Sequence, residues 1–121
     1  MAKVLVIDND INDADLISLH LEKAGHSITY ASSARNALDT IEVINFDVVI
    51  TDIIMPEIDG LDFIKELNNT GKKIPVIAVS GLGKQFLPIA EVVGASYIIE
   101  KSDNYYEKLI ERVNRLTVAA P

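Results

Sequence analysis

Acidic side chains, one hydroxyl and one lysine follow four short apolar runs of the sequence. Asp8 and Asn9 come after the first run and Asp52 after the second, while Ser80 and Lys101 follow the last two. A carboxylate can attack phosphorus as a nucleophile, and carboxylates are ligands that Mg²⁺ prefers. A hydroxyl and an ammonium can bind the non-bridging oxygens of a phosphoryl group. The set therefore indicates phosphoryl transfer, with Asp52 as the acceptor.

The four apolar runs have the composition of strands buried on both faces. They are rich in β-branched residues, continuous rather than alternating, and lie at 4–7, 48–50, 76–79 and 97–99. A weaker run at 27–31 contains two polar residues, and we expect it at the sheet edge. Segments with helical spacing separate the runs, at 11–24, 34–44, 61–68, 87–93 and 104–117.

Five strands that alternate with five helices require crossover connections. These are right-handed in nearly all proteins and produce a parallel sheet covered on both faces. We therefore expect an α/β fold, a doubly wound five-stranded parallel sheet of flavodoxin-like (βα)5 topology with helices on both faces. The ligand crevice of such a sheet lies beyond the carboxyl ends of its strands, so the fold should bring the chemical groups together there.

Residues at the predicted helix ends support these assignments. Asn12, Ser33 and Asp103 can cap helix starts, and Gly25 stands where the first helix should end. Pro88 fits a first turn, which predicts that the fourth helix begins late.

The composition indicates one globular domain. The chain has 121 residues, of which 49% are hydrophobic and 24% charged. We expect residues 1–118 to form the domain and 119–121 a C-terminal tail, with no output domain after it. The net charge of -7 disfavours binding of this domain to nucleic acid or to a membrane. The absence of cysteine and of any signal-peptide or membrane-spanning run predicts a cytoplasmic protein.

Four segments of the sequence, in order and at similar spacing, resemble the response-regulator receiver domains of two-component signalling. They are Val-Leu-Val-Ile-Asp-Asn-Asp at 4–10, Val-Val-Ile-Thr-Asp-Ile-Ile-Met-Pro-Glu-Ile-Asp-Gly at 48–60, Pro-Val-Ile-Ala-Val-Ser-Gly at 75–81 and Gly-Ala-Ser-Tyr-Ile-Ile-Glu-Lys at 94–101. The resemblance covers nearly the whole chain.

The resemblance implies a phosphorylation switch rather than an enzyme. A sensor histidine kinase or a histidine phosphotransfer protein would phosphorylate Asp52, and a downstream protein that the sequence does not identify would read the state. Ser80 would be the hydroxyl that follows phosphorylation, and Lys101 the phosphate-binding lysine. The implied ligands of Mg²⁺, or of Mn²⁺, are Asp8, Asn9, Asp52 and the backbone carbonyl of Ile54.

Three positions depart from the family pattern. Asn9 replaces the usual second acid, which removes one negative charge opposite a dication and predicts weaker Mg²⁺ binding unless Asp10 reaches the metal. Ser102 follows Lys101 where the family usually has proline, which predicts a trans peptide there. Ile98 stands where an aromatic side chain often changes rotamer, so the glycine-rich loop 81–84 is an alternative route for the signal.

Two other functions stay open from the sequence. The first is a degenerate receiver that binds proteins without accepting phosphate, which Asn9, Ser102 and Ile98 would support. The second, with less support, is a small phosphatase resembling the haloacid dehalogenase superfamily, with Asp8 as nucleophile. That scheme lacks a later acidic metal motif and leaves Asp52 without a role.

The remaining polar aromatic side chains carry no chemistry in this interpretation. His20 and His26 are the only histidines, and we assign both to surface or packing. Of the adjacent Tyr105 and Tyr106, we expect one on the core face of the last helix, with Tyr105 available to a partner-binding surface.

Overall fold

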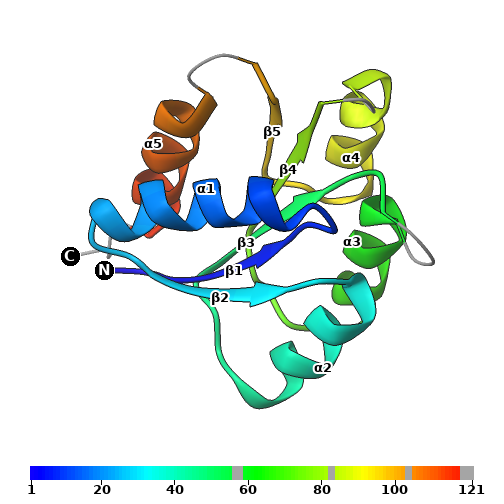
Figure 1. Ribbon diagram of the computed structural model, residues 1–121. Coiled ribbons are helices and arrows are strands. Elements are labelled where there is room, and N and C mark those ends of the chain that lie inside the picture. The colour runs from blue at the N-terminus through cyan, green and yellow to red at the C-terminus, as the bar shows by residue number, and fades with distance from the viewer. Residues whose placement is uncertain (56–58, 82–83, 103–104, 118–121) are drawn as a thin grey trace.

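A computed structural model describes residues 1–55, 59–81, 84–102 and 105–117, which form a five-stranded parallel sheet with helices on both faces (Figure 1). The order along the chain is β1 (Lys3–Ile7), α1 (Ile11–Lys23), β2 (Ser27–Ala31), α2 (Ala34–Val43), β3 (Val48–Asp52), α3 (Gly60–Asn69), β4 (Val76–Ser80), a 3₁₀ turn (Lys84–Phe86), α4 (Leu87–Val93), β5 (Tyr97–Glu100) and α5 (Tyr105–Thr117). The strand order is β2-β1-β3-β4-β5, and every neighbouring pair is parallel. The predicted doubly wound α/β fold is confirmed.

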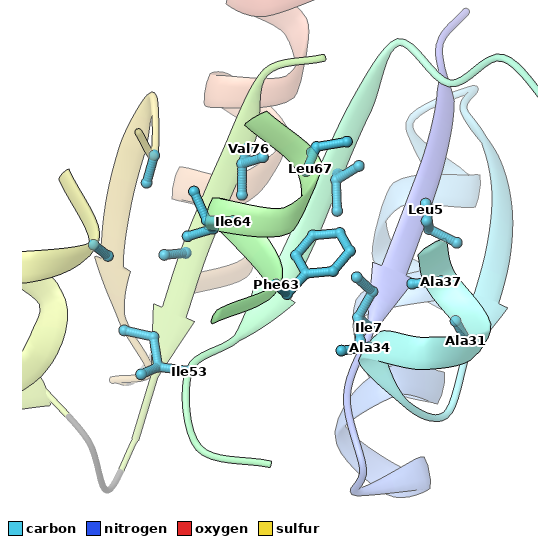
Figure 2. Packing of buried hydrophobic residues seen from close by; sticks show 14 of the residues in the cluster. Leu5, Ile7, Ala31, Ala34, Ala37, Ile53, Phe63, Ile64, Leu67 and Val76 are labelled. Carbon is cyan, nitrogen blue, oxygen red and sulfur yellow. The ribbon is translucent and has the colours of Figure 1, made fainter. Parts of the chain in front are cut away.

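Two apolar clusters, one on each face, hold the helices to the sheet. Alternate residues of a strand point to opposite faces, so Leu5 joins the cluster under α2, α3 and α4, whereas Val4 joins the cluster under α1 and α5. Figure 2 shows Phe63 and Ile64 of α3 among the side chains of the first cluster. Because both faces are covered, the inner strands are continuously apolar, while β2 at the edge is only partly buried.

Most predicted helix ends agree with the structure to within one or two residues. Ser33 caps α2 by accepting a hydrogen bond from the N–H of Asn36, and Gly25 lies just past α1 with φ +95. Pro88 lies in the first turn of α4, as predicted. None of the helices in the described ranges is long and apolar enough to cross a membrane.

One predicted cap is wrong. Asp10, not Asn12, caps α1, because Asp10 is the last extended residue before the helix and its side chain accepts hydrogen bonds from the N–H groups of Asn12 and Asp13. The predicted cap Asp103 and the expected tail at 119–121 lie outside the described residues. The described residues also exclude 56–58 of the second motif and 82–83 of the glycine-rich loop.

Tyr105 is buried, so its predicted place on a partner-binding surface is wrong. It lies four and eight residues before Leu109 and Val113, and the three share the face of α5 that packs into the second cluster. Tyr106 is half-buried, and its ring stacks on that of His20 with centroids 4.2 Å apart.

His26 is a packing residue, as predicted, and it joins distant parts of the chain. Its Nδ1 accepts a hydrogen bond from the N–H of Ala2 at 3.0 Å, so Nε2 carries the proton and donates to Asn114 of α5 at 2.8 Å. The ring therefore links the start of β1 to the last helix.

Candidate functional site

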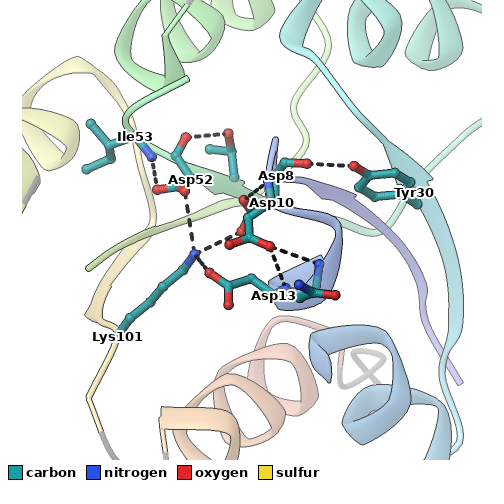
Figure 3. Close-up of polar contacts among 9 residues, drawn as sticks. Asp8, Asp10, Asp13, Tyr30, Asp52, Ile53 and Lys101 are labelled. Carbon is teal, nitrogen blue, oxygen red and sulfur yellow. Dashed lines mark hydrogen bonds and ion pairs between the residues drawn. The ribbon is translucent and has the colours of Figure 1, made fainter. Parts of the chain in front are cut away.

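The carboxyl ends of three strands and the first turn of α1 meet around one ammonium group (Figure 3). Lys101 Nζ lies 2.9 Å from Asp8 Oδ2 and 2.9 Å from Asp13 Oδ2. It lies 3.5 Å from Asp52 Oδ2. The fold thus brings together Asp8, Asp52 and Lys101, which the sequence placed at the ends of three different strands.

Backbone hydrogen bonds orient the two acids that end strands. Asp8 is almost fully buried, and its Oδ1 accepts a hydrogen bond from the N–H of Asp10 at 2.9 Å. Asp52 is the last residue of β3, and its Oδ1 accepts from the N–H of Ile53 at 2.8 Å, so Oδ2 is the oxygen closer to Lys101. Each carboxylate therefore keeps one oxygen toward the ammonium.

Burial and neighbouring charge change the acidity of the acceptor candidate. Burial raises the pKa of Asp52, the ammonium of Lys101 opposes that rise, and the charge of Asp8 adds to it. Burial alone would lower the pKa of Lys101, but hydrogen bonds to Asp8 and Asp13 outweigh it and hold that pKa above its usual range. The lysine therefore remains a cation beside acids that repel one another.

A cavity of about 280 Å³ opens at this edge of the sheet. Its lining residues are Asn9, Asp10, Asp13, Asp52, Ile54, Ser80, Gly81 and Lys101. Every predicted site residue except the buried Asp8 therefore borders one space. A larger hollow of about 480 Å³ lies before β4, but no carboxylate lines it.

The sequence missed two residues that support this site. Asp13 pairs with Lys101, and the hydroxyl of Tyr30 on β2 donates a hydrogen bond to the backbone carbonyl of Asp8 at 2.8 Å. Asp13 could have been found from the sequence if Asp10 had been recognised as the N-cap of α1. A helix that begins after Asp10 has Asp13 in its first turn, beside the site. No pattern in the sequence indicated Tyr30.

The departures from the family pattern can also be located. The peptide bonds of the described residues are trans, including the bond between Lys101 and Ser102, as predicted. Ile98 is half-buried and packs against the first cluster.

The donor groups have the chemistry that a hard dication requires. Of the predicted ligands, Asn9, Asp52 and Ile54 line the cavity, and the buried Asp8 lies beside it through its ion pair with Lys101. They offer two carboxylates, an amide oxygen and a backbone carbonyl. Among the described residues, no three acidic, His or Cys side chains are already arranged as a metal site. The ammonium of Lys101 lies between the acids instead, so a metal would displace it from Asp8 and Asp52.

Comparison with known proteins gives consistent matches. A family model described as the response regulator receiver domain matches residues 4–114. The receiver domain of the Francisella response regulator 1452 has a TM-score of 0.87 and 33% sequence identity, and the match covers 96% of each chain. The response regulator SaeR of Staphylococcus aureus is 27% identical over 117 residues, which cover 96% of this chain and 50% of SaeR. The probable transcriptional regulatory protein SilR of Salmonella typhimurium is 31% identical over 81 residues, which cover 67% of this chain and 36% of SilR. The matches therefore span half or less of these two curated relatives.

Proposed function

The chain belongs to the response regulator receiver domain family, and from this premise we propose that it is a phosphorylation switch whose phosphoryl acceptor is Asp52. The observation that carries the proposal is the approach of Lys101 Nζ to within 3.5 Å of the Asp52 carboxylate, at the mouth of a shared cavity. Phosphorylation adds negative charge to an acid that is already poorly solvated. A cation already within ion-pair distance of it lowers the cost of that charge.

In the proposed transfer, a carboxylate oxygen of Asp52 forms a bond to phosphorus. The bond between phosphorus and an imidazole nitrogen of the donor breaks, and that nitrogen leaves with the bonding electron pair. Asp52 must be ionised to attack, so the rise in its pKa opposes the reaction at acidic pH.

Two side chains of this chain would bind the transferred group. Lys101 would move its ammonium from Asp8 and Asp13 toward a phosphoryl oxygen, and Ser80, at the end of β4, would donate its hydroxyl to another. Such movements would favour a second conformation of the surface around the site, to which partners bind differently.

Asp8, Asn9, Asp52 and the backbone carbonyl of Ile54 would hold Mg²⁺ or Mn²⁺. When bound, the dication supplies positive charge that offsets the repulsion among the carboxylates and the phosphoryl oxygens. Asn9 carries no charge, so we expect weaker binding than at a site with two acids at this position.

The proposed donor is a sensor histidine kinase or a histidine phosphotransfer protein, and the proposed reader is a separate protein target. Support comes from the family, whose members SaeR and SilR are named as regulators. The donor must be a separate protein, because neither histidine of this chain lines the cavity. His20 lies in α1 and His26 directly before β2.

The test is intact-mass spectrometry after incubation with Mg²⁺ and acetyl phosphate. We expect a single phosphoryl adduct on the wild type, none on Asp52→Asn, and an unchanged yield on Asp15→Asn. Asp15 is the matched control because it is an exposed acid of α1 that does not line the cavity.

An adduct that persists in Asp52→Asn would disprove the acceptor assignment. If the wild type gains no adduct with acetyl phosphate or with a competent histidine kinase, the chain is better described as a phosphorylation-independent binding module. Loss of the adduct in Asp8→Asn combined with its retention in Asp52→Asn would favour the phosphatase alternative.

A further inference from the structure

Lys101 has a close partner that the proposed transfer does not use. Asp13 lies as near to the ammonium as Asp8 does, with 2.9 Å between Nζ and each Oδ2. The proposed acceptor Asp52 is the farthest of the three acids, at 3.5 Å. In the unphosphorylated protein the lysine therefore pairs more closely with Asp8 and with Asp13 of α1 than with the acceptor.

The backbone fixes both ends of the Asp13–Lys101 pair. Asp10 caps α1 through the N–H of Asp13, which places Asp13 in the first helical turn. The N–H of Lys101 donates to the carbonyl of Ser80 at 2.9 Å, which ties the residue after β5 to the end of β4. The side chain of Lys101 can therefore move between partners without disturbing these backbone contacts.

The ammonium of Lys101 has three N–H donors, and it already contacts three carboxylates, so a phosphoryl group on Asp52 would compete with Asp13 for it. A phosphoryl oxygen on Asp52 would draw Lys101 away from α1, and the charge of Asp13 would oppose this both by holding the ammonium and by repelling the new anion. Asp13 should affect binding of a dication in the opposite way, by favouring it. By drawing Lys101 toward α1, Asp13 leaves Asp52 less tightly paired and adds negative charge beside both proposed metal-binding acids.

We propose that Asp13 is a positioning residue that draws Lys101 toward α1 and lengthens its contact with Asp52 in the unphosphorylated state, favouring the bound metal and opposing the bound phosphoryl group. This rests on the proposed function of Asp52 and adds a second carboxylate that controls the lysine. It also gives a role to an acid at a site where Asn9 has replaced one.

A purely structural role for Asp13 makes a different prediction. An acid in the first turn interacts favourably with the positive end of the helix dipole, and its loss would weaken α1 and the whole site with it. Binding of the metal and of a phosphoryl analogue would then both become weaker. The positioning role changes the two affinities in opposite directions.

The experiment is calorimetric titration of wild type, Asp13→Asn and Asp15→Asn at one pH and one ionic strength. Each protein is titrated with Mg²⁺ alone and then, at saturating Mg²⁺, with beryllofluoride as the phosphoryl analogue. For Asp13→Asn we expect Mg²⁺ affinity about 2–5-fold lower and beryllofluoride affinity about 2–5-fold higher, the size typical of a partly exposed ion pair. Asp15→Asn removes the same charge from an exposed position of α1, and we expect both affinities to stay near those of the wild type.

Each other result has one meaning. If Asp13→Asn weakens both ligands, strengthens Mg²⁺ binding, or changes neither affinity while the wild type binds both, the positioning role is wrong and the proposed function stands. If Asp15→Asn changes both affinities as much as Asp13→Asn does, the net charge of the protein is responsible. That result also overturns the positioning role of Asp13. If the wild type itself fails to bind beryllofluoride at saturating Mg²⁺, the proposed function fails and the inference fails with it.

Discussion

Asp52 carries its negative charge in surroundings that oppose it. Its side chain is only 14% exposed, burial raises its pKa, and the charge of Asp8 raises it further. Lys101 offsets only part of this, because it is shared with two closer acids. The acceptor is thus an acid whose charge the folded protein stabilises less well than water does.

The raised pKa of Asp52 leads to a prediction about stability. A carboxyl group whose pKa is higher in the folded state disfavours folding when it is ionised, so its neutral isostere should be more stable at neutral pH. We expect Asp52→Asn to raise Tm at pH 7 by about 2–5 °C, measured by thermal unfolding without metal. The gain should shrink as the pH falls through the raised pKa of folded Asp52 and disappear below about 3.9, the pKa of an unfolded aspartate, where the group is protonated in both states.

Asp39→Asn is the control for this measurement, because Asp39 is an exposed acid in the middle of α2, away from the helix ends. A lower Tm for Asp52→Asn than for the wild type at pH 7 would contradict the prediction, since it would mean that the ionised carboxylate stabilises the fold.

At the scale of elements, the start of α3 determines where the acceptor lies. Gly60, its first residue, donates its N–H to the carbonyl of Ile53 at 2.7 Å. A Cβ at this position would overlap the carbonyl oxygen of Asp52 and lie 2.8 Å from Cα of Ile53. The helix can therefore approach the end of β3 this closely only with glycine at its first position.

Gly60→Ala should displace the backbone of Asp52 as well as weaken the fold. We expect the free energy of unfolding to fall by about 1–3 kcal/mol, the usual cost of overpacking a tight contact, measured by urea denaturation. The yield of phosphoryl adduct from acetyl phosphate should fall with it.

For stability, Gly81→Ala is the matched control, because among the described residues a Cβ there would meet only the Lys101 side chain, at 3.7 Å. If Gly60→Ala and Gly81→Ala unfold at the same urea concentration, the close approach of α3 does not constrain β3.

At the scale of the whole molecule, His26 joins the two ends of the described chain. Its ring accepts from Ala2 and donates to Asn114, so it connects the residue before β1 to the last helix. Only 8% of His26 is exposed and Ala2 is fully buried, so few water molecules can replace the bond between them. These two hydrogen bonds hold α5 against the sheet at the end opposite the candidate site.

His26→Ala should weaken the attachment of α5 to the start of the sheet. It leaves a buried backbone N–H and a side-chain amide without their partners, and we expect the free energy of unfolding to fall by about 1–3 kcal/mol. Hydrogen exchange should increase first at the start of β1 and the end of α5. His20→Ala is the control, since His20 is partly exposed and only stacks on Tyr106. Equal losses for the two variants would show that the His26 bridge has no special role.

The sequence by itself predicted the elements, the fold class and most of the site. Continuous β-branched runs mark strands covered on both faces, and Ser33, Gly25 and Pro88 mark helix ends through local backbone chemistry. The candidate site followed from one rule of topology, because parallel strands carry their carboxyl ends to the same edge. Asp52, Ser80 and Lys101 could therefore be assigned to one site without coordinates.

Only the tertiary structure decided how these groups are paired. Lys101 lies 93 residues from Asp8 and 88 from Asp13 in sequence, yet all three meet within hydrogen-bonding distance. The burial of Tyr105 and the bond from Tyr30 to Asp8 likewise depend on how helices and the edge strand pack. A local pattern specifies which way a residue points from its own element. The distance between two side chains depends on the packing of every element between them. A change of about 1 Å in that distance can form or break an ion pair.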